Sequence, residues 1–85
     1  MRTITTDLLI NDDHRADGTY YAYAAQPAGN VVADATAPTW QGALAALHSR
    51  LCGFLRVSRD TVIVSRNGDQ FAREGPLDRH GNLAL

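Results

Sequence analysis

The chain has 85 residues and a formal net charge of −1, which leaves room for one domain with one core. This balance excludes a strongly basic wrap for nucleic acid and the dense acidic surface of a nucleic-acid mimic. The single cysteine, Cys52, forms no internal disulfide, and no apolar run approaches the roughly 20 residues that a bilayer span requires. We therefore expect one cytoplasmic domain over residues 1–85, with no membrane contact.

Apolar runs and turn formers divide the first part of the chain into three predicted strands. Residues 2–10 are rich in Thr and Ile and predict the first strand. The loop at 11–18 is rich in Asn, Asp and Gly, which favour turns. Residues 19–25 predict a second strand, in which Tyr21, Tyr23 and Ala25 share one face and Tyr20, Ala22 and Ala24 share the other. A Pro/Gly turn at 27–30 then leads into a third strand at 31–35.

The segment from Thr39 to Leu55 predicts an amphipathic helix with Thr39 as its N-cap. Its apolar stripe follows the helical period and comprises Trp40, Leu44, Leu47, Leu51 and Phe54. The opposite face carries small residues in place of the usual Glu and Lys, namely Gly42, Ala45, Ala46, Ser49, Cys52 and Gly53. We expect the stripe to pack on the sheet and the small-residue face to stay free.

After the helix, the sequence predicts a hairpin around Asn67-Gly68, because this pair favours a two-residue type I′ turn. Counting outward from the turn pairs Val64 with Phe71. This register puts Val62, Val64 and Phe71 on the face that covers the helix. Residues 75–85 contain two Gly-led breakers, so we expect a loose tail or a short edge segment.

The order of these elements predicts an α+β fold. Its architecture is a two-layer sandwich, in which an antiparallel sheet of order β-β-β-α-β-β carries one helix on one face.

Residues 17–47 combine an aromatic strand after a turn glycine, a Pro/Gly turn, a short strand and a helix that starts with Thr. These features occupy Asp17-Gly18, Tyr20 to Tyr23, Pro27 to Gly29 and Thr39 to Leu44. In this order they resemble the HicB antitoxin family. The overall layout is also similar to small anti-CRISPR proteins encoded by phages. Both resemblances imply a domain of a phage or mobile element that binds a protein partner, either a toxin or a nucleic-acid-processing complex, without catalysis.

Catalytic and metal-binding patterns are weak in this chain. His48 and Cys52 are four residues apart on the predicted helix, but no third orienting group accompanies them in the sequence. We expect this pair to be buried or packed at an interface. The Asp-rich loop at 11–18 resembles a calcium loop, yet Arg15 and Ala24 fall where oxygen ligands are required. We therefore predict a non-enzyme with no metal and no cofactor.

Two interaction surfaces follow from the predicted elements. The first is a protein-docking or homodimer surface on the small-residue face of the helix, comprising Gly42, Ala45, Ala46, Ser49 and Gly53. Tyr20 or Tyr21, whichever row points away from the helix, would add an aromatic contact on the open side of the sheet. The alternative is a small nucleic-acid-binding module that uses an arginine strip, comprising Arg56, Arg59, Arg66 and Arg73.

Overall fold

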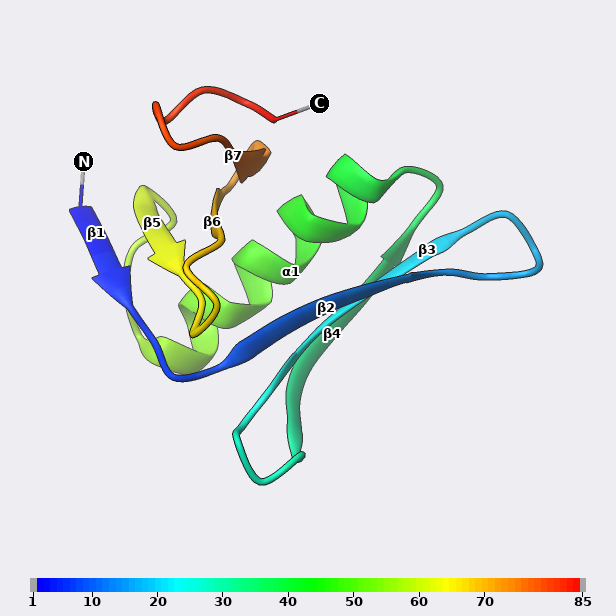
Figure 1. Ribbon diagram of the computed structural model, residues 1–85, viewed down its shortest axis with the longest axis horizontal. Helices are drawn as coiled ribbons and strands as arrows, with labels where there is room; N and C mark the ends of the chain where they lie inside the picture. The colour runs from blue at the N-terminus through cyan, green and yellow to red at the C-terminus, as the bar shows by residue number, and fades with distance from the viewer. Residues whose placement is uncertain (1, 85) are drawn as a thin grey trace.

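The computed structural model describes residues 2–84 and confirms the α+β class, with seven strands in two sheets and one helix packed against them (Figure 1). The elements in chain order are β1 (Arg2–Thr5), β2 (Leu9–His14), β3 (Tyr20–Ala25), β4 (Val31–Ala37), α1 (Trp40–Leu55), β5 (Thr61–Val64), β6 (Gln70–Ala72) and β7 (Gly75–Leu77). The helix contacts β3 and β4 of one sheet and β6 and β7 of the other. One hydrophobic core therefore joins both sheets to α1.

The three-stranded sheet is antiparallel, in the order β2-β3-β4. Its register places Ala22 between Asp12 and Ala35, and Tyr21 between Asp13 and Thr36. Ala22, Ala24 and Ala35 are buried in the core with the helix. Because side chains alternate along a strand, the row that contains Tyr21 and Tyr23 faces away from α1.

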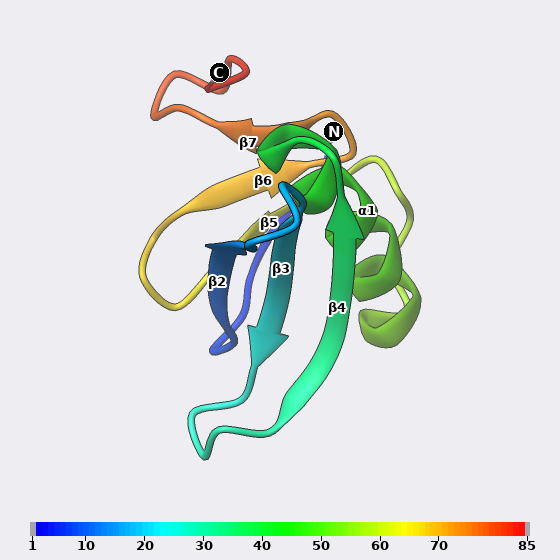
Figure 2. The same cartoon turned by 90° about the vertical axis from the view of Figure 1, so that its right-hand side faces the viewer.

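The four-stranded sheet has the order β1-β5-β6-β7, with β1 parallel to β5 and the other pairs antiparallel. Figure 2 shows that its strands run at a steep angle to those of the three-stranded sheet. The single strand predicted at residues 2–10 is therefore wrong. These residues form β1 and the start of β2, which belong to different sheets. The chain bends at Thr6, whose hydroxyl accepts from the Leu8 N–H at 3.2 Å, and Leu8 becomes buried at the bend.

The helix begins where the sequence predicted, because the Thr39 hydroxyl accepts a hydrogen bond from the Gly42 N–H at 3.0 Å. It ends at Leu55, and Arg56 follows as the C-cap in a left-handed conformation with φ 58°. The prediction that Phe54 joins the core is wrong, since this residue is 51% exposed. Two sheets rather than one flank α1, so the buried face extends around the helix to His48 and Cys52 and leaves Phe54 outside.

The predicted register of the β5–β6 hairpin is also wrong. Ser65 donates to the Asp69 carbonyl at 2.8 Å and Gly68 donates to Ser65 at 3.0 Å, so the loop has three residues instead of two. Gly68 has φ 90°, as a type I turn followed by a glycine bulge requires. Ile63 consequently pairs with Phe71 in place of Val64, and this shift of one residue reverses which face of β5 meets the helix.

The same hydrogen-bond pattern, with a glycine of positive φ in the third loop position, recurs in four loops, at residues 16–18, 27–29, 66–68 and 79–81. The last of these follows β7 at the edge of the four-stranded sheet. Ala84 then donates to the Pro76 carbonyl at 2.9 Å, which holds the end of the described chain against β7. Within residues 2–84, no helix is long and apolar enough to cross a membrane.

Candidate functional site

The outward face of the three-stranded sheet carries an aromatic pair. The Tyr21 and Tyr23 rings lie 5.3 Å apart between centroids at an interplanar angle of 26°, and both residues are half-buried. The Tyr21 hydroxyl donates to Asp34 Oδ2 at 2.9 Å, and the Arg15 guanidinium lies 4.4 Å from the Tyr21 ring centroid. The hydrogen bond to Asp34 raises the pKa of Tyr21 above its ordinary value. These contacts hold two large apolar surfaces in fixed positions on the open side of the sheet.

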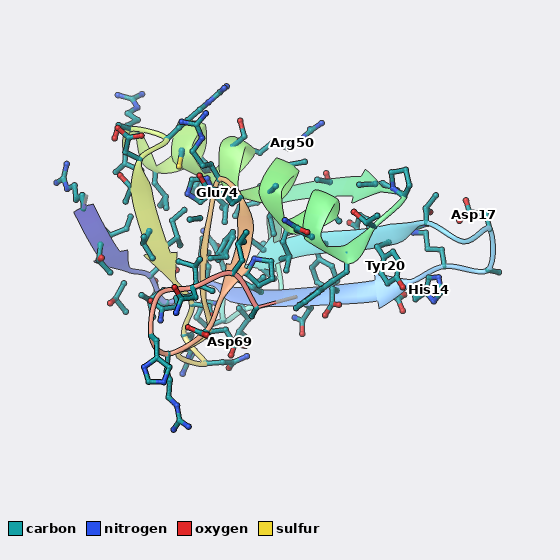
Figure 3. All side chains as sticks on the ribbon, turned by 90° about the horizontal axis from the view of Figure 1, so that it is seen from above. His14, Asp17, Tyr20, Arg50, Asp69 and Glu74 are labelled. Carbon is teal, nitrogen blue, oxygen red and sulfur yellow. The ribbon has the colours of Figure 1, made fainter. Side chains whose placement is uncertain are left out.

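Tyr20 belongs to the opposite row. Its ring stacks on His14 with centroids 4.2 Å apart and planes 6° from parallel, and it packs against the core. Figure 3 shows this pair near the far end of the β2–β3 hairpin, whose turn contains Asp17. Of the two tyrosines considered in the sequence, Tyr21 is therefore the one that points away from the helix. Its neighbour Tyr23 completes the pair, and the alternation of the strand already placed it on that face.

The small-residue face of α1 is less open than the sequence suggested. Gly42, Ala45, Ala46 and Ser49 are half-buried, and Gly53 is exposed. Ala46 packs against the core. A Cβ atom on Gly42 would lie 2.9 Å from Thr39 Oγ1 and 3.3 Å from Ala37 Cβ. At this position the lack of a side chain therefore serves the packing of the helix against β4.

His48 and Cys52 form a buried pair. His48 Nε2 lies 2.6 Å from the Thr61 carbonyl oxygen, and Cys52 Sγ lies 3.8 Å from His48 Nδ1. A carbonyl oxygen only accepts, so Nε2 carries the proton and donates it to Thr61. Burial raises the pKa of the Cys52 thiol, against a smaller opposing effect of the Arg59 charge. The imidazole thus links α1 to β5, and the surroundings disfavour the thiolate that a nucleophile needs.

The four predicted arginines lie at two ends of the four-stranded sheet. Arg56 and Arg59 come before β5 begins, whereas Arg66 lies in the loop after it ends. Arg73, between β6 and β7, has ion-pair contacts of 3.9 Å with both Asp60 and Glu74. Since β6 runs antiparallel to β5, Arg73 shares the end of the sheet that contains Asp60. The predicted strip is therefore divided, and part of its charge is offset by neighbouring carboxylates.

Phe54 marks an apolar surface that the sequence pattern missed, because its spacing fits the core stripe. With Leu55, it lines a hollow of about 410 Å³ beside the β3–β4 turn, to which Pro27 and Ala28 also contribute. Phe54 can serve as a contact residue because half of its surface is free.

Charge is distributed unevenly along the chain. Residues 7–37, which form the three-stranded sheet, contain five Asp and one Arg. Residues 38–84 contain six Arg and four acidic residues. The two aromatic rings therefore lie in an acidic region, although the whole chain is close to neutral.

Within residues 2–84, no group of three or more His, Cys, Asp or Glu side chains is arranged to hold a metal ion. Comparison with known proteins found no matching family model, and no curated protein or solved structure with significant similarity.

Proposed function

We propose that this chain is a non-catalytic protein-binding domain that docks on a basic surface of its partner through the outward face of the three-stranded sheet. The observation that carries this proposal is the stacked Tyr21–Tyr23 pair among carboxylates. Aromatic residues are enriched at protein interfaces, where they supply a large contact area at a low cost in conformational entropy.

The charges around the tyrosines determine which partner fits. The sheet register places Asp13 beside Tyr21 and Asp34 beside Tyr23 on the same face, while Arg15 lies over the Tyr21 ring. Carboxylates outnumber the basic group, so the complementary partner surface carries Lys and Arg. Proteins that bind nucleic acid present such surfaces to phosphates. This reasoning favours an inhibitor of a nucleic-acid-processing system, the class that the HicB-like and anti-CRISPR-like resemblances predict.

The buried His48–Cys52 pair supports a function without catalysis. His48 Nε2 is committed to the Thr61 carbonyl, and burial raises the pKa of the Cys52 thiol. The one pair whose spacing suggested a nucleophile thus links the helix to a strand.

A further prediction concerns the small-residue face of α1, which we propose as a second contact, in a homodimer or with the same partner. Ala45→Arg tests this face by light scattering, because a bulky charge there would dissociate a dimer.

Affinity capture from the native host, followed by a binding assay with the purified partner, tests the main proposal. We expect Tyr21→Ala with Tyr23→Ala to weaken binding by about 2 kcal/mol or more, as hot-spot residues do. Asp13→Arg, at an exposed position beside Tyr21, should weaken it further by placing like charges together. Arg59→Ala with Arg66→Ala is the matched control and should leave binding unchanged. A partner that binds the tyrosine variant as tightly as the wild type would refute the proposal.

The alternative function is a small nucleic-acid-binding module. Arg59 before β5 and Arg66 after it are the observation that favours it, since both are exposed. Under this alternative, Arg59→Ala with Arg66→Ala would abolish binding to a labelled single-stranded oligonucleotide, and wild-type affinity would fall steeply with salt. The same double variant therefore separates the two functions.

A further inference from the structure

β4 ends the order β2-β3-β4, so one long side of this strand has no neighbouring strand within residues 2–84. Proteins usually shield such an edge with charged side chains, Pro, a short strand or a covering segment, because its unpaired backbone groups can add a further strand. β4 has seven residues, without Lys, Arg or Pro. The other edges are better shielded, since β1 has only four residues, β2 carries Asp12 and Asp13, and Ala84 donates to Pro76 beside β7. The edge of β4 is therefore the most open one.

The hydrogen bonds of two hairpins show which backbone groups of β4 face this edge. Along a strand in an antiparallel sheet, the N–H and C=O of one residue point to one neighbouring strand, and those of the next residue point to the other side. Gln26 donates to the Asn30 carbonyl at 2.8 Å, so the even-numbered residues of β3 point to β4. Arg15 donates to the Thr19 carbonyl at 2.8 Å, and counting from this bond through the β2–β3 register gives the same assignment.

The β4 residues paired with the even-numbered positions of β3 are Ala33, Ala35 and Ala37. Their backbone groups point to β3, so those of Asp34 and Thr36 point to the open edge. Both of these residues are exposed. The register shift between β3 and β4 lies near their connecting turn, so the ladder is regular at this end of the strand. Two N–H and two C=O groups are thus spaced to receive an antiparallel strand.

The outward face of this edge is acidic. Asp34 is the only charged residue of β4, and its side chain lies in the row of Tyr21 and Tyr23. Its Oδ2 accepts from the Tyr21 hydroxyl at 2.9 Å, which holds the carboxylate on this face. A carboxylate has acceptor capacity for a further donor, and opposite charges stabilise directly opposed cross-strand residues. The strand residue that lies opposite Asp34 is therefore best matched by Lys or Arg.

The inner face of the edge is apolar and lacks bulk. Figure 2 shows α1 behind β4. A Cβ on Gly42 would lie 3.3 Å from Ala37 Cβ, so the start of the helix lies against the end of the strand. One helical turn rises about 5.4 Å and two strand residues span about 7 Å, which brings Ala46 near the level of Ala35. A side chain that points inward from an added strand would meet Gly42 and Ala46, where a medium-sized apolar group fits.

We propose that β4 receives an extended segment of the protein partner as an antiparallel fourth strand of this sheet, and that Lys or Arg alternates with apolar residues in this segment. The basic residues lie on the outward face beside Asp34, and the apolar residues lie against the small-residue face of α1. Main-chain hydrogen bonds to Asp34 and Thr36 supply affinity, and the alternating side chains supply specificity. This inference rests on the proposed function, because the tyrosine pair lies on the same face one strand away, and it names the part of the partner that docks.

The probe is a hexapeptide with blocked ends in which Lys and Val alternate, titrated into the full chain and followed by the backbone amide signals in NMR. The amides of Asp34 and Thr36 should shift and should exchange with solvent at least about tenfold more slowly. In an antiparallel pair, the residues that exchange hydrogen bonds have their side chains on the same face, so the Lys amides of the bound peptide face β4. N-methylation of the Lys residues should weaken binding about tenfold. N-methylation of the Val residues is the matched control, with the same mass and charge, and should leave binding unchanged.

Substitutions in the chain test the same edge. Thr36→Pro removes an N–H that points away from β3, which an edge strand tolerates, and should weaken peptide binding about tenfold. Thr36→Val keeps this N–H and is its control, with circular dichroism of both variants as the check on folding. Asp34→Asn should weaken binding about threefold, because the ion pair that it removes is exposed. Asp13→Asn removes the same charge from β2, two strands away, and should have no effect.

The inference is overturned if the peptide leaves the Asp34 and Thr36 amides unchanged, or if methylation of the Lys and of the Val residues weakens binding equally. Light scattering of the chain alone tests the rival occupant, a second copy. A dimer that Thr36→Pro dissociates would assign the edge to that copy and would also overturn the inference. With the captured partner, the tyrosine double variant and Thr36→Pro separate the two proposals. Loss of binding in the tyrosine variant alone would keep the docking face and exclude strand addition.

Discussion

On the three-stranded sheet, the buried residues that face α1 are alanines, whereas the four-stranded sheet meets the same helix with larger and more polar groups. Ala22, Ala24 and Ala35 form the first contact, which we call the alanine seam. His48, Cys52 and Thr61 are buried at the second, which we call the polar seam. Small side chains let a helix and a sheet approach closely. At the polar seam, the buried His48 ring donates to the Thr61 carbonyl, and this hydrogen bond favours one arrangement of helix and strand.

The two seams also differ in what lies behind them. Behind the alanine seam, the outward face of the sheet carries Tyr21 and Tyr23. Tyr21 and Tyr23 are thus turned away from α1, whereas Tyr20 packs against the core on the same row as the alanines. Behind the polar seam, the exposed arginines are partly paired with carboxylates. This comparison is the reason that we propose the three-stranded sheet, and not the four-stranded sheet, as the docking surface.

The largest expected effect comes from filling the alanine seam. Ala22 is fully buried, so Ala22→Leu would push α1 away from β3. Overpacking of a dense core costs about 2 to 3 kcal/mol in the free energy of unfolding. Urea denaturation followed by circular dichroism measures the loss. Ala28→Leu, at an exposed turn position, is the control and should change stability by less than about 0.5 kcal/mol. Equal losses in both variants would mean that the seam is loosely packed.

The next effect tests the polar seam. His48→Leu keeps most of the buried volume but removes the donor to the Thr61 carbonyl, to which Nε2 lies at 2.6 Å. Leaving a buried acceptor without its partner costs about 1 to 2 kcal/mol. His48→Gln retains an N–H donor and should cost less in the same denaturation experiment. If both substitutions destabilise the protein equally, packing rather than the hydrogen bond maintains this seam.

Much of the helix could be predicted from the sequence, because its determinants are local. The hydroxyl of Thr39 and the spacing of Leu44, Leu47 and Leu51 are read directly from the chain, and the structure confirms both. Phe54 obeys the same spacing and yet is exposed. Its position depends on where the two sheets stop covering α1, and that limit is set by tertiary packing rather than by periodicity.

Strand pairing was harder to predict. The parallel pairing of Ile4 with Ile63 joins the start of the chain to a strand beyond the helix, and no local pattern encodes it. The hairpin register failed for a different reason. Asn67-Gly68 fits a two-residue turn, but glycine in the third position of a three-residue loop satisfies the same local signal. The hydrogen bond from Ser65 to the Asp69 carbonyl, which only the folded chain shows, distinguishes the two.

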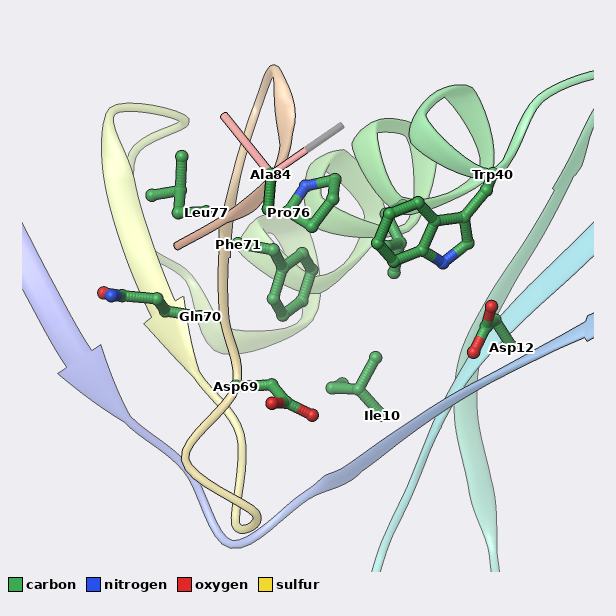
Figure 4. A pocket seen from close by; sticks show the side chains of 10 residues that line it. Ile10, Asp12, Trp40, Asp69, Gln70, Phe71, Pro76, Leu77 and Ala84 are labelled. Carbon is green, nitrogen blue, oxygen red and sulfur yellow. The ribbon is translucent and has the colours of Figure 1, made fainter. Parts of the chain in front are cut away.

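The candidate sites differ in the same way, because one follows from the local sequence and the other depends on tertiary packing. The alternation of side chains along β3 places Tyr21 and Tyr23 on one face, so the aromatic pair could be predicted from the sequence. The cavity of about 260 Å³ at the N-terminal end of α1 (Figure 4) could not be predicted, because its lining residues Asp12, Trp40 and Asp69 come from three distant segments that meet only when both sheets pack on α1. Residues with no mutual spacing signal can be recognised as a site only in the folded chain.

A smaller effect on the polar seam concerns pH. Burial raises the pKa of the Cys52 thiol above the value of about 8.5 in an unfolded chain. Between the two values, the unfolded chain releases a proton that the native chain retains, so stability is fully present below about pH 8.5 and falls as pH rises further. Cys52→Ala removes this dependence. The difference in unfolding free energy between wild type and variant should therefore shrink or change sign between about pH 8 and pH 10. A difference that stays constant over this range would contradict the raised pKa of Cys52.

The smallest effect compares the two glycines at opposite ends of α1, one close to the alanine seam and one beyond it. Gly53 has open space where a Cβ would lie, so Gly53→Ala should stabilise the helix by about 0.5 to 1 kcal/mol. At Gly42 the new Cβ would lie 2.9 Å from Thr39 Oγ1, the group that caps the helix. Displacing this cap costs about 1 kcal/mol, which offsets the gain in helix propensity and leaves Gly42→Ala neutral or slightly destabilising. Thermal unfolding of both variants measures the contrast. An equal gain at both positions would mean that β4 does not hold the start of the helix as closely as the alanine seam requires.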